Sequence, residues 1–458
     1  MDTIDKKQGM FPFVRESGIG KKGWGRMKAQ NGAGIYPALR KVALGEQPAE
    51  LVIKRANVLN VYTDEFCLCD VAVEGGLIAG LGEYQGKREI DAQGRYLVPG
   101  LIDAHLHIES SMLTPGHFAG LVARHGTTVL IADPHEIANV KGEEGIRYML
   151  HAAKDLPLHL FLMLPSCVPA TPFDSGGACL EAAQLSPFLR EGAVYGLGEM
   201  MNYAGVVAGD QTVLQKLSAF SHLPIDGHAP GLVGKELQAY RLAGIRTEHE
   251  CATGEEMREK LRAGFAIWIR EGAGAKNLDT LISCLVREGL PANRCGFCTD
   301  DRHIDDIERE GHISHCVRRA IELGMDPVQA YKTASFYPAQ LYGLNRHGAI
   351  SPGCHADFLL LDGLEQVDIH SVFFRGKQVE QELDGREEEV PSALLHTVHL
   401  PPLTVEDFRL EIGPGKQPVI VFLPRQIGTK LSFCSLPSSR GRFLAQGEYR
   451  KAVVVERH

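Results

Sequence analysis

The sequence predicts an α/β protein, a (β/α)₈ TIM barrel with a small β-sandwich domain built from both ends of the chain. Buried-type apolar runs recur eight times between residues 96 and 300. Segments with helical spacing of apolar residues separate most of these runs, and short β-rich runs flank the series on both sides. Strands that alternate with helices are typical of a parallel sheet, and eight such repeats are typical of a barrel.

The composition is that of an ordinary globular protein of 458 residues, with 44% hydrophobic and 23% charged residues. A chain of this length predicts one large domain and a smaller one. The formal net charge of −9 offers no positive field for nucleic acid or anionic lipid. We therefore expect neither partner, and the lack of a hydrophobic signal core predicts a cytoplasmic protein. The eleven cysteines fit reduced thiols.

Changes in composition divide the chain into five segments. Residues 1–45 are rich in glycine and basic residues and are expected to form an irregular extension. Residues 46–96 and 344–382 contain short β-rich runs and are expected to form the small domain together, around a barrel of residues 97–343. Residues 383–458, with strand-like runs at 418–422 and 452–455, are interpreted as the start of a truncated C-terminal domain.

Each barrel strand is predicted from an apolar run of buried-strand type. The eight runs are 96–105, 128–133, 159–164, 194–199, 224–228, 244–249, 265–270 and 295–300. Intervening helices are predicted at 142–154, 235–242, 254–263 and 278–288, with a terminal helix at 327–342.

Polar residues stand at the carboxyl ends of these runs, which form the active-site face of a barrel. One histidine on an apolar strand is usually a core residue, but seven polar residues at the same end are hard to attribute to packing. They are His105, His107, Asp133, Glu199, His228, His249 and Asp300.

Six of the seven predict a metal centre. The i, i+2 spacing of His105 and His107 places both imidazoles on one side of a strand. With Glu199, His228, His249 and Asp300 they provide enough ligands for two divalent ions that share the Glu199 carboxylate. Such ions lower the pKa of a bound water, and Asp300 can accept its proton. This ligand set predicts a hydrolase.

Long motifs then identify a family. The first-strand run at 99–107 resembles the amidohydrolase superfamily, and the neighbouring motifs resemble adenine deaminases in particular. These motifs lie at 107–114, 132–139, 163–170, 196–202, 226–231, 248–250 and 298–303. The resemblance implies two divalent ions, Mn²⁺ or Fe²⁺ with Zn²⁺ as a further option. It also implies that hydroxide attacks C6 of adenine and that ammonia leaves, as in purine salvage. Asp300 and Glu199 are then the catalytic residues.

A second group of side chains is available for hydrogen bonds to the purine. They lie after the second, third, seventh and eighth predicted strands. The alternative, equally weighted, is that they hold the metal ligands in place. These residues are Asp133, His135, Glu136, Ser166, Arg270, Glu271 and Asp301.

Other interpretations carry less weight. Relatives that hydrolyse cyclic amides commonly have a carboxylated lysine where this chain has Glu199. A single-zinc deaminase would need Cys295 and Cys298 near His107, but these cysteines lie inside a predicted strand. Another aminopurine or cyclic amidine as substrate stays open, as does a truncated paralogue with weak or lost activity that acts as a binding module. Barrels of this kind are frequently homo-oligomers, which we expect here.

Overall fold

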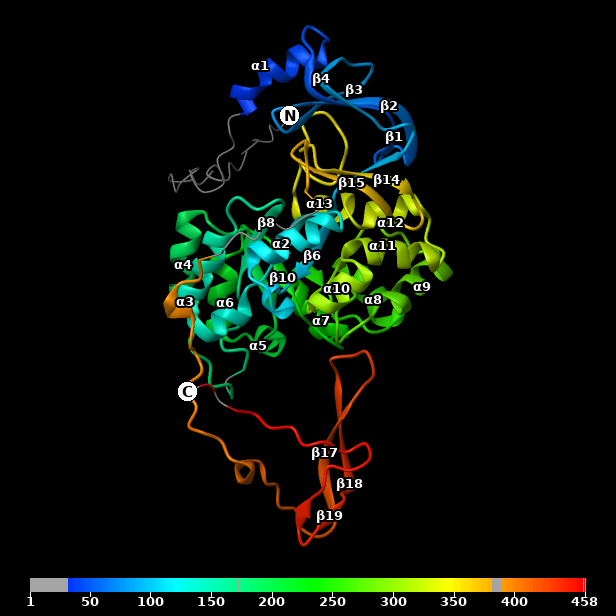
Figure 1. Cartoon of the computed structure of the whole chain (residues 1–458). Helices are drawn as coiled ribbons and strands as arrows, with labels where there is room; N and C mark the ends of the chain where they lie inside the picture. Colours follow the sequence, from blue (N-terminus) through cyan, green and yellow to red (C-terminus); the bar gives the residue numbers. More distant parts are fainter. Residues whose placement is uncertain (1–31, 172, 381–388, 456, 458) are drawn as a thin grey trace, which may run out of the picture.

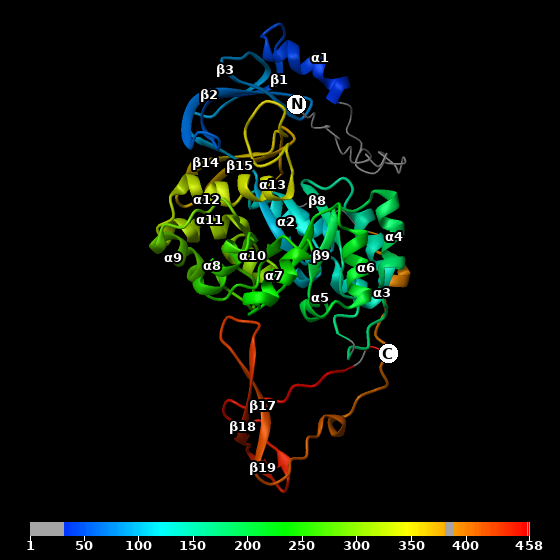
Figure 2. The ribbon, with the colours of Figure 1, turned by 180° about the vertical axis from the view of Figure 1, so that it is seen from behind.

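The computed structural model describes residues 32–171, 173–380, 389–455 and 457. A curled parallel sheet surrounded by helices occupies the middle of the molecule. A second sheet covers one end of it, and the strands after residue 415 lie at the opposite end (Figures 1 and 2). The mixed α/β character predicted from the sequence is confirmed.

The central strands form a five-stranded sheet, in the order β10-β9-β8-β7-β6, and a three-stranded sheet, β11-β12-β13. All neighbours within them are parallel. The amide of Arg246 donates to the Ile225 carbonyl at 3.1 Å, and the amide of Asp300 donates to the His105 carbonyl at 3.0 Å. These bonds join the two sheets at both edges. The strands are β6 (Leu101–Leu106), β7 (Thr127–Ala132), β8 (His159–Leu164), β9 (Gly196–Met200), β10 (Ile225–Gly227), β11 (Thr247–Glu248), β12 (Ala266–Arg270) and β13 (Cys295–Cys298).

Amphipathic helices pack around these strands. In α9, for example, Leu278, Leu281, Ile282 and Leu285 are buried at the spacing of one helical face. The helices are α2 (Pro115–Arg124), α3 (His135–Ala152), α4 (Ala182–Glu191), α5 (Tyr203–Ala208), α6 (Gln211–Ala219), α7 (Gly234–Leu242), α8 (Gly254–Arg262), α9 (Leu278–Glu288), α10 (Ile304–Glu310), α11 (Ile313–Glu322), α12 (Pro327–Thr333) and α13 (Phe336–Tyr342). A short 3₁₀ helix, η1 (Ile108–Ser111), follows β6.

The second sheet has eight strands and is built from both flanks of the central part. Its main order is β16-β15-β14-β5-β1-β2-β3, and β4 pairs separately with β1. The backbone of β1 bulges between Ile53 and Ala56, where the edge changes its partner from β4 to β5. The strands are β1 (Ala49–Asn60), β2 (Glu65–Glu74), β3 (Leu77–Gly82), β4 (Gly86–Asp91), β5 (Tyr96–Pro99), β14 (Phe358–Gly363), β15 (Asp368–Phe374) and β16 (Lys377–Gln378).

The C-terminal strands form an antiparallel hairpin, β17 (Lys416–Phe422) and β18 (Thr429–Ser435), followed by β19 (Ser438–Ser439) and β20 (Arg442–Phe443). Two short 3₁₀ helices, η2 (Ser392–Leu394) and η3 (Val405–Phe408), precede them. The hairpin tip contacts the segment after β12, where the Lys276 amide donates to the Arg425 carbonyl at 3.2 Å. Within the described residues, every helix is too short or too polar to cross a bilayer.

The predicted irregular extension is wrong for residues 32–43, which form helix α1 (Gly32–Ala43). Ile35, Leu39 and Val42 follow one helical face, and Leu39 and Val42 pack in a cluster with Val52 of the second sheet. The helix was missed because its apolar face is short and gains stability only from this sheet. Residues 1–31 lie outside the described part of the chain.

Two predicted elements are divided in the structure. The run 96–105 is two strands, because the Gly100 amide bonds to Asp357 of the second sheet and the Leu101 amide bonds to Gly126 beside β7. The predicted terminal helix is α12 and α13, because the Ala334 carbonyl accepts a hydrogen bond from Ile102 instead of continuing a helix.

The strand-like run at 452–455 is not a strand. Val453, Val454 and Val455 are 47%, 92% and 43% exposed. Within the described residues, this apolar run therefore does not pack against a sheet or a helix. Apolar sequence predicts a strand only where the side chains become buried.

Gly100 is required where the chain passes from β5 to β6. A Cβ at this position would lie 2.1 Å from the Thr128 hydroxyl oxygen and 2.6 Å from its methyl carbon. We expect Gly100→Ala to destabilise the fold by about 1–3 kcal/mol because the neighbouring strand must move. Gly413, which has no atom within 4 Å of an added Cβ, provides the control Gly413→Ala. Equal thermal midpoints for the two variants would contradict this expectation.

Lys260 of α8 is fully buried and compensates a buried carboxylate. Its ammonium group lies 3.1 Å from Glu248 and 2.7 Å from Glu256, and it donates to the Ala229 carbonyl at 2.7 Å. Lys260→Met leaves Glu248 buried without its cation, which costs about 3–5 kcal/mol in comparable pairs. We expect a clear fall in the thermal midpoint, measured by circular dichroism. The exposed Lys235 provides the control Lys235→Met, and a fall of the same size there would refute the argument.

Candidate metal centre and active site

The six predicted ligands come together at the carboxyl ends of five strands. His105 lies on β6 and His107 follows it directly, Glu199 lies on β9, and His228 and His249 follow β10 and β11 directly. Asp300 follows β13. All except His228 are at most 6% exposed, and the side chain of His228 is 19% exposed. The structure therefore brings together all six residues that the sequence predicted for this site.

The Glu199 carboxylate lies at the centre of this cluster. One oxygen is 3.3 Å from Nε2 of His107, and the other is 2.7 Å from Nδ1 of His228 and 3.2 Å from Nε2 of His249. Asp300 approaches from the other side, with Oδ1 at 3.1 Å from Nε2 of His107 and 3.9 Å from Nε2 of His105. This arrangement groups the side chains into overlapping sets of three potential metal ligands. Two of these sets contain Glu199, one with His105 and His249 and the other with His107 and His135.

The donor chemistry fits divalent cations. Nδ1 of His107 contacts the Asp133 carbonyl at 2.8 Å, and a carbonyl can only accept, so this nitrogen carries the hydrogen. Nε2, the other ring nitrogen, faces the carboxylates of Glu199 and Asp300. Nε2 of His105 and both ring nitrogens of His249 are buried without a hydrogen-bond partner among the described residues. Such nitrogens are costly to bury unless they bind something, and a metal ion satisfies them.

The local charges agree with this interpretation. Burial alone would raise the pKa of Glu199, but His228, His107 and His249 hold its pKa well below the ordinary value. Burial also lowers the pKa of His105 well below its ordinary value. Buried anionic carboxylates beside a neutral imidazole form an environment that attracts cations.

Backbone contacts fix the central carboxylate. The Glu199 amide donates to Asp133 at 3.0 Å, and the Ser166 hydroxyl donates to the Glu199 carbonyl. Asp133 can approach this closely because residue 198 is glycine, where a Cβ would lie 2.0 Å from the Asp133 oxygen. Asp133 and Ser166, which were candidates for substrate contact, thus bond to the backbone that carries Glu199.

Arg270 and Glu250 form a buried pair beside the cluster. Both terminal nitrogens of Arg270 donate to the Glu250 carboxylate, and one also donates to Oδ2 of Asp300 at 2.6 Å. Glu250 lies 3.5 Å from Nδ1 of His228 and 3.3 Å from Nε2 of His249. The sequence did not assign Glu250 to the site, because neighbouring residues of a strand point to opposite faces and Glu250 is next to His249.

The remaining candidates lie around this cluster. Nδ1 of His135 is 3.4 Å from Glu199, and its Nε2 is 3.3 Å from the half-exposed Glu136. Asp301 is exposed and accepts a hydrogen bond from the Ser110 hydroxyl. Glu271 instead lies 3.6 Å from the Lys276 ammonium group, so the structure places it in a separate ion pair.

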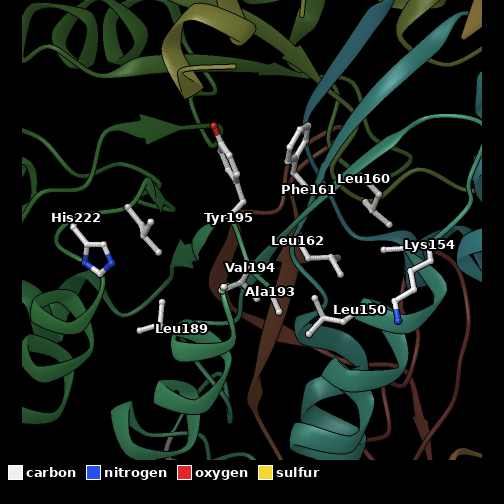
Figure 3. Close-up of a pocket in the computed structure, with 13 residues that line it drawn as sticks. Leu150, Lys154, Leu160, Phe161, Leu162, Leu189, Ala193, Val194, Tyr195 and His222 are labelled. Carbon is white, nitrogen blue, oxygen red and sulfur yellow. The ribbon is translucent and has the colours of Figure 1, made fainter. Parts of the chain in front are cut away.

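A cavity of about 350 Å³ lies away from these residues. Figure 3 shows Leu150 of α3 and Lys154 just after this helix, with Val194, Tyr195 and His222 around the same space. Val194 and Tyr195 precede β9, and His222 precedes β10. The cavity therefore lies at the amino ends of these two strands, whereas Glu199 and His228 lie at their carboxyl ends. This mainly apolar cavity is not part of the candidate active site.

Comparison with known proteins places the chain in a family. Residues 96–379 match the model of the amidohydrolase family. The adenine deaminase of Desulfitobacterium hafniense is 44% identical over 416 residues, which are 91% of this chain and 73% of that protein. The adenine deaminase of Bacillus pumilus is 44% identical over 427 residues, which are 91% of this chain and 74% of its own length.

A solved structure supports the same fold. The crystal structure of an adenine deaminase superposes with a TM-score of 0.55 at 18% sequence identity, and it covers 72% of this chain and 99% of that one. At this identity the likeness concerns the fold alone. The family model and the close relatives carry the assignment further: the chain belongs to the amidohydrolase family, among its members named adenine deaminases.

Proposed function

We propose that this protein is an adenine deaminase, which hydrolyses adenine with water to hypoxanthine and ammonia. The observation that carries the proposal is the 44% identity over 91% of the chain to an enzyme of that name. The buried cluster around Glu199 supports it independently, because His, Asp and Glu side chains in this grouping suit metal-assisted hydrolysis.

Members of this family use divalent metals, and the proposed ligands are His105, His107, Glu199, His228, His249 and Asp300. We propose two ions, manganese or iron, with zinc accepted by the same donors. Bound ions of this kind supply a water that is acidic enough to provide hydroxide near neutral pH.

The chain's own residues move the proton and hold the geometry. Asp300 is the proposed proton acceptor, and it returns the proton to the amino group that leaves C6 as ammonia. Oδ1 of Asp300 faces the imidazoles, whereas Oδ2 accepts from Arg270. Glu199, held through Asp133 and Ser166, is the central carboxylate that would help to hold the ions.

The purine is proposed to contact the residues around the cluster, of which His135, Glu136 and Asp301 are placed best. Asp133, Ser166 and Arg270 are proposed as positioning residues, since their hydrogen bonds go to Glu199, Glu250 or Asp300. Glu271 is the weakest of the predicted contacts because Lys276 lies beside it.

We further propose that the eight central strands close into a complete (β/α)₈ barrel. The hydrogen bonds at both edges of the two parallel sheets support closure. The pairing of β1 with both β4 and β5 in the second sheet supports the predicted sandwich, made of residues 46–96 and 344–382 around a barrel of residues 97–343. A C-terminal unit after residue 383, a homo-oligomer and a cytoplasmic location stay predictions.

The proton-transfer role is tested with Asp300→Asn. The amide cannot accept the proton and has no negative charge for a cation, so we expect the rate of ammonia release from adenine to fall by at least about 100-fold. Asp305 is exposed, and Asp305→Asn is the matched control. Manganese-loaded wild type and variant are compared with the metal content measured in parallel. A near-normal rate of ammonia release by the Asp300→Asn variant would contradict the proposed mechanism.

The positioning role of Glu250 is tested with Glu250→Gln. Arg270 then loses the negative charge of Glu250 and keeps only that of Asp300, so it is expected to bind Asp300 more strongly. We expect about a 10–100-fold loss of activity or of metal affinity, as for other residues that support ligands. The 80% exposed side chain of Glu255 provides the control Glu255→Gln. If both variants match wild type in kcat and in bound metal, Glu250 has no such role.

A further inference from the structure

A second group of histidines lies at the opposite ends of the central strands. His159 is the first residue of β8, His347 follows α13, and His355 precedes β14 of the second sheet. Asp357 lies between His355 and that strand. Three segments that are far apart in the sequence therefore meet where the second sheet covers the barrel. Neither the sequence motifs nor the proposed reaction uses these side chains.

The geometry of this group is compact. The ring centroids are 4.5 Å apart for His159 and His347, 4.7 Å for His159 and His355, and 4.8 Å for His347 and His355. One nitrogen from each of the three rings lies within 4.8 Å of the others. Oδ2 of Asp357 is 2.9 Å from Nε2 of His159 and 3.9 Å from Nδ1 of His347. The four side chains thus face one small volume.

These groups are buried and incompletely satisfied. The side chains of His159, His347 and Asp357 are 10%, 8% and 7% exposed. Nδ1 of His347 has no hydrogen-bond partner among the described residues, although it is inaccessible to solvent. Asp357 uses its other oxygen to accept from the Arg375 amide at 2.7 Å, which leaves Oδ2 directed at the histidines. A purely structural hydrogen-bond network would not leave the His347 nitrogen without a partner.

We propose that His159, His347, His355 and Asp357 bind a divalent transition-metal ion, Zn²⁺ by preference, in a site separate from the active site. Three imidazoles and one carboxylate are donors that Zn²⁺ accepts in fourfold coordination. A tautomer shift of His159 moves its hydrogen to Nδ1 and frees Nε2 for the ion. The ion ties β8 of the barrel to the second sheet, so its role is structural. The proposal does not depend on the substrate of the active site.

Metal stoichiometry of the full chain tests the site. Purified protein is stripped with a chelator, equilibrated with Zn²⁺, dialysed and analysed by mass spectrometry of the metal. We expect His355→Gln and His347→Gln each to hold one zinc less per chain than wild type. His370 lies on β15 of the same sheet and is 43% exposed, so His370→Gln is the matched control and should retain the wild-type zinc content. Equal zinc in wild type, His347→Gln and His355→Gln overturns the proposal.

A second measurement separates the two sites and does not depend on the folding of the His347 variant. The double variant His105→Ala, His107→Ala removes two proposed ligands of the active site. Co²⁺ added to this variant should still give the visible absorption of a four-coordinate ion. Adding His355→Gln should remove this absorption, and adding His370→Gln should leave it. Zn²⁺ should also raise the thermal midpoint of the His105→Ala, His107→Ala chain, because it binds only the folded state. Absence of both the Co²⁺ signal and the thermal shift in that chain rejects the site.

Discussion

The buried Glu199 carboxylate is the interaction on which the rest of this structure depends. Three imidazole nitrogens lie within 3.3 Å of it, from strands that are far apart in the chain. A buried anion is costly unless cations or hydrogen bonds compensate it. The parallel strands provide this compensation, because they bring their carboxyl ends, and with them the histidines, to the same edge. The cluster around Glu199 therefore forms only because the parallel sheet curls and brings these strand ends together.

The two ends of the central strands serve different purposes. At the carboxyl ends, loops that begin with a ligand leave the strands, and the tip of the β17–β18 hairpin contacts the segment after β12. At the amino ends, the second sheet bonds directly to the strand entries, as the Gly100 amide does to Asp357. Asp357 also contacts His159, so the same carboxylate connects the sheet to β8. Rigidity at one end supports the precise geometry required at the other.

The sequence was sufficient for features that depend on local pattern. The apolar run at 159–164 and the helical spacing at 278–288 predicted β8 and α9 with the bounds that the structure has. Polar residues at the carboxyl ends of the apolar runs predicted all six residues of the cluster. Features that depend on tertiary contacts were missed. Helix α1 needs the second sheet, and the histidines at 159, 347 and 355 come from three separate segments.

Glu250 shows the same limit at a finer scale. Consecutive residues of a strand point to opposite faces, so strand alternation excludes Glu250 beside His249. The chain leaves the strand here because the Glu248 carboxylate accepts from the amides of Glu250 and Cys251 at 3.0 and 3.1 Å. The side chains of His249 and Glu250 can then both face the cluster. Lys260 compensates that Glu248 carboxylate, which links a buried salt bridge in α8 to the geometry of the site.

Arg270 places a further constraint on the proposed chemistry. A guanidinium that donates to Asp300 stabilises the anion and so opposes uptake of a proton by that carboxylate. Glu250 limits this effect, because it engages both terminal nitrogens of Arg270 and shares the positive charge. The carboxylates of Glu199, Glu250 and Asp300 provide anionic donors for cations beside the one guanidinium. Burial alone would raise the pKa of Asp300, but His107, His249 and Arg270 together hold its pKa well below the ordinary value.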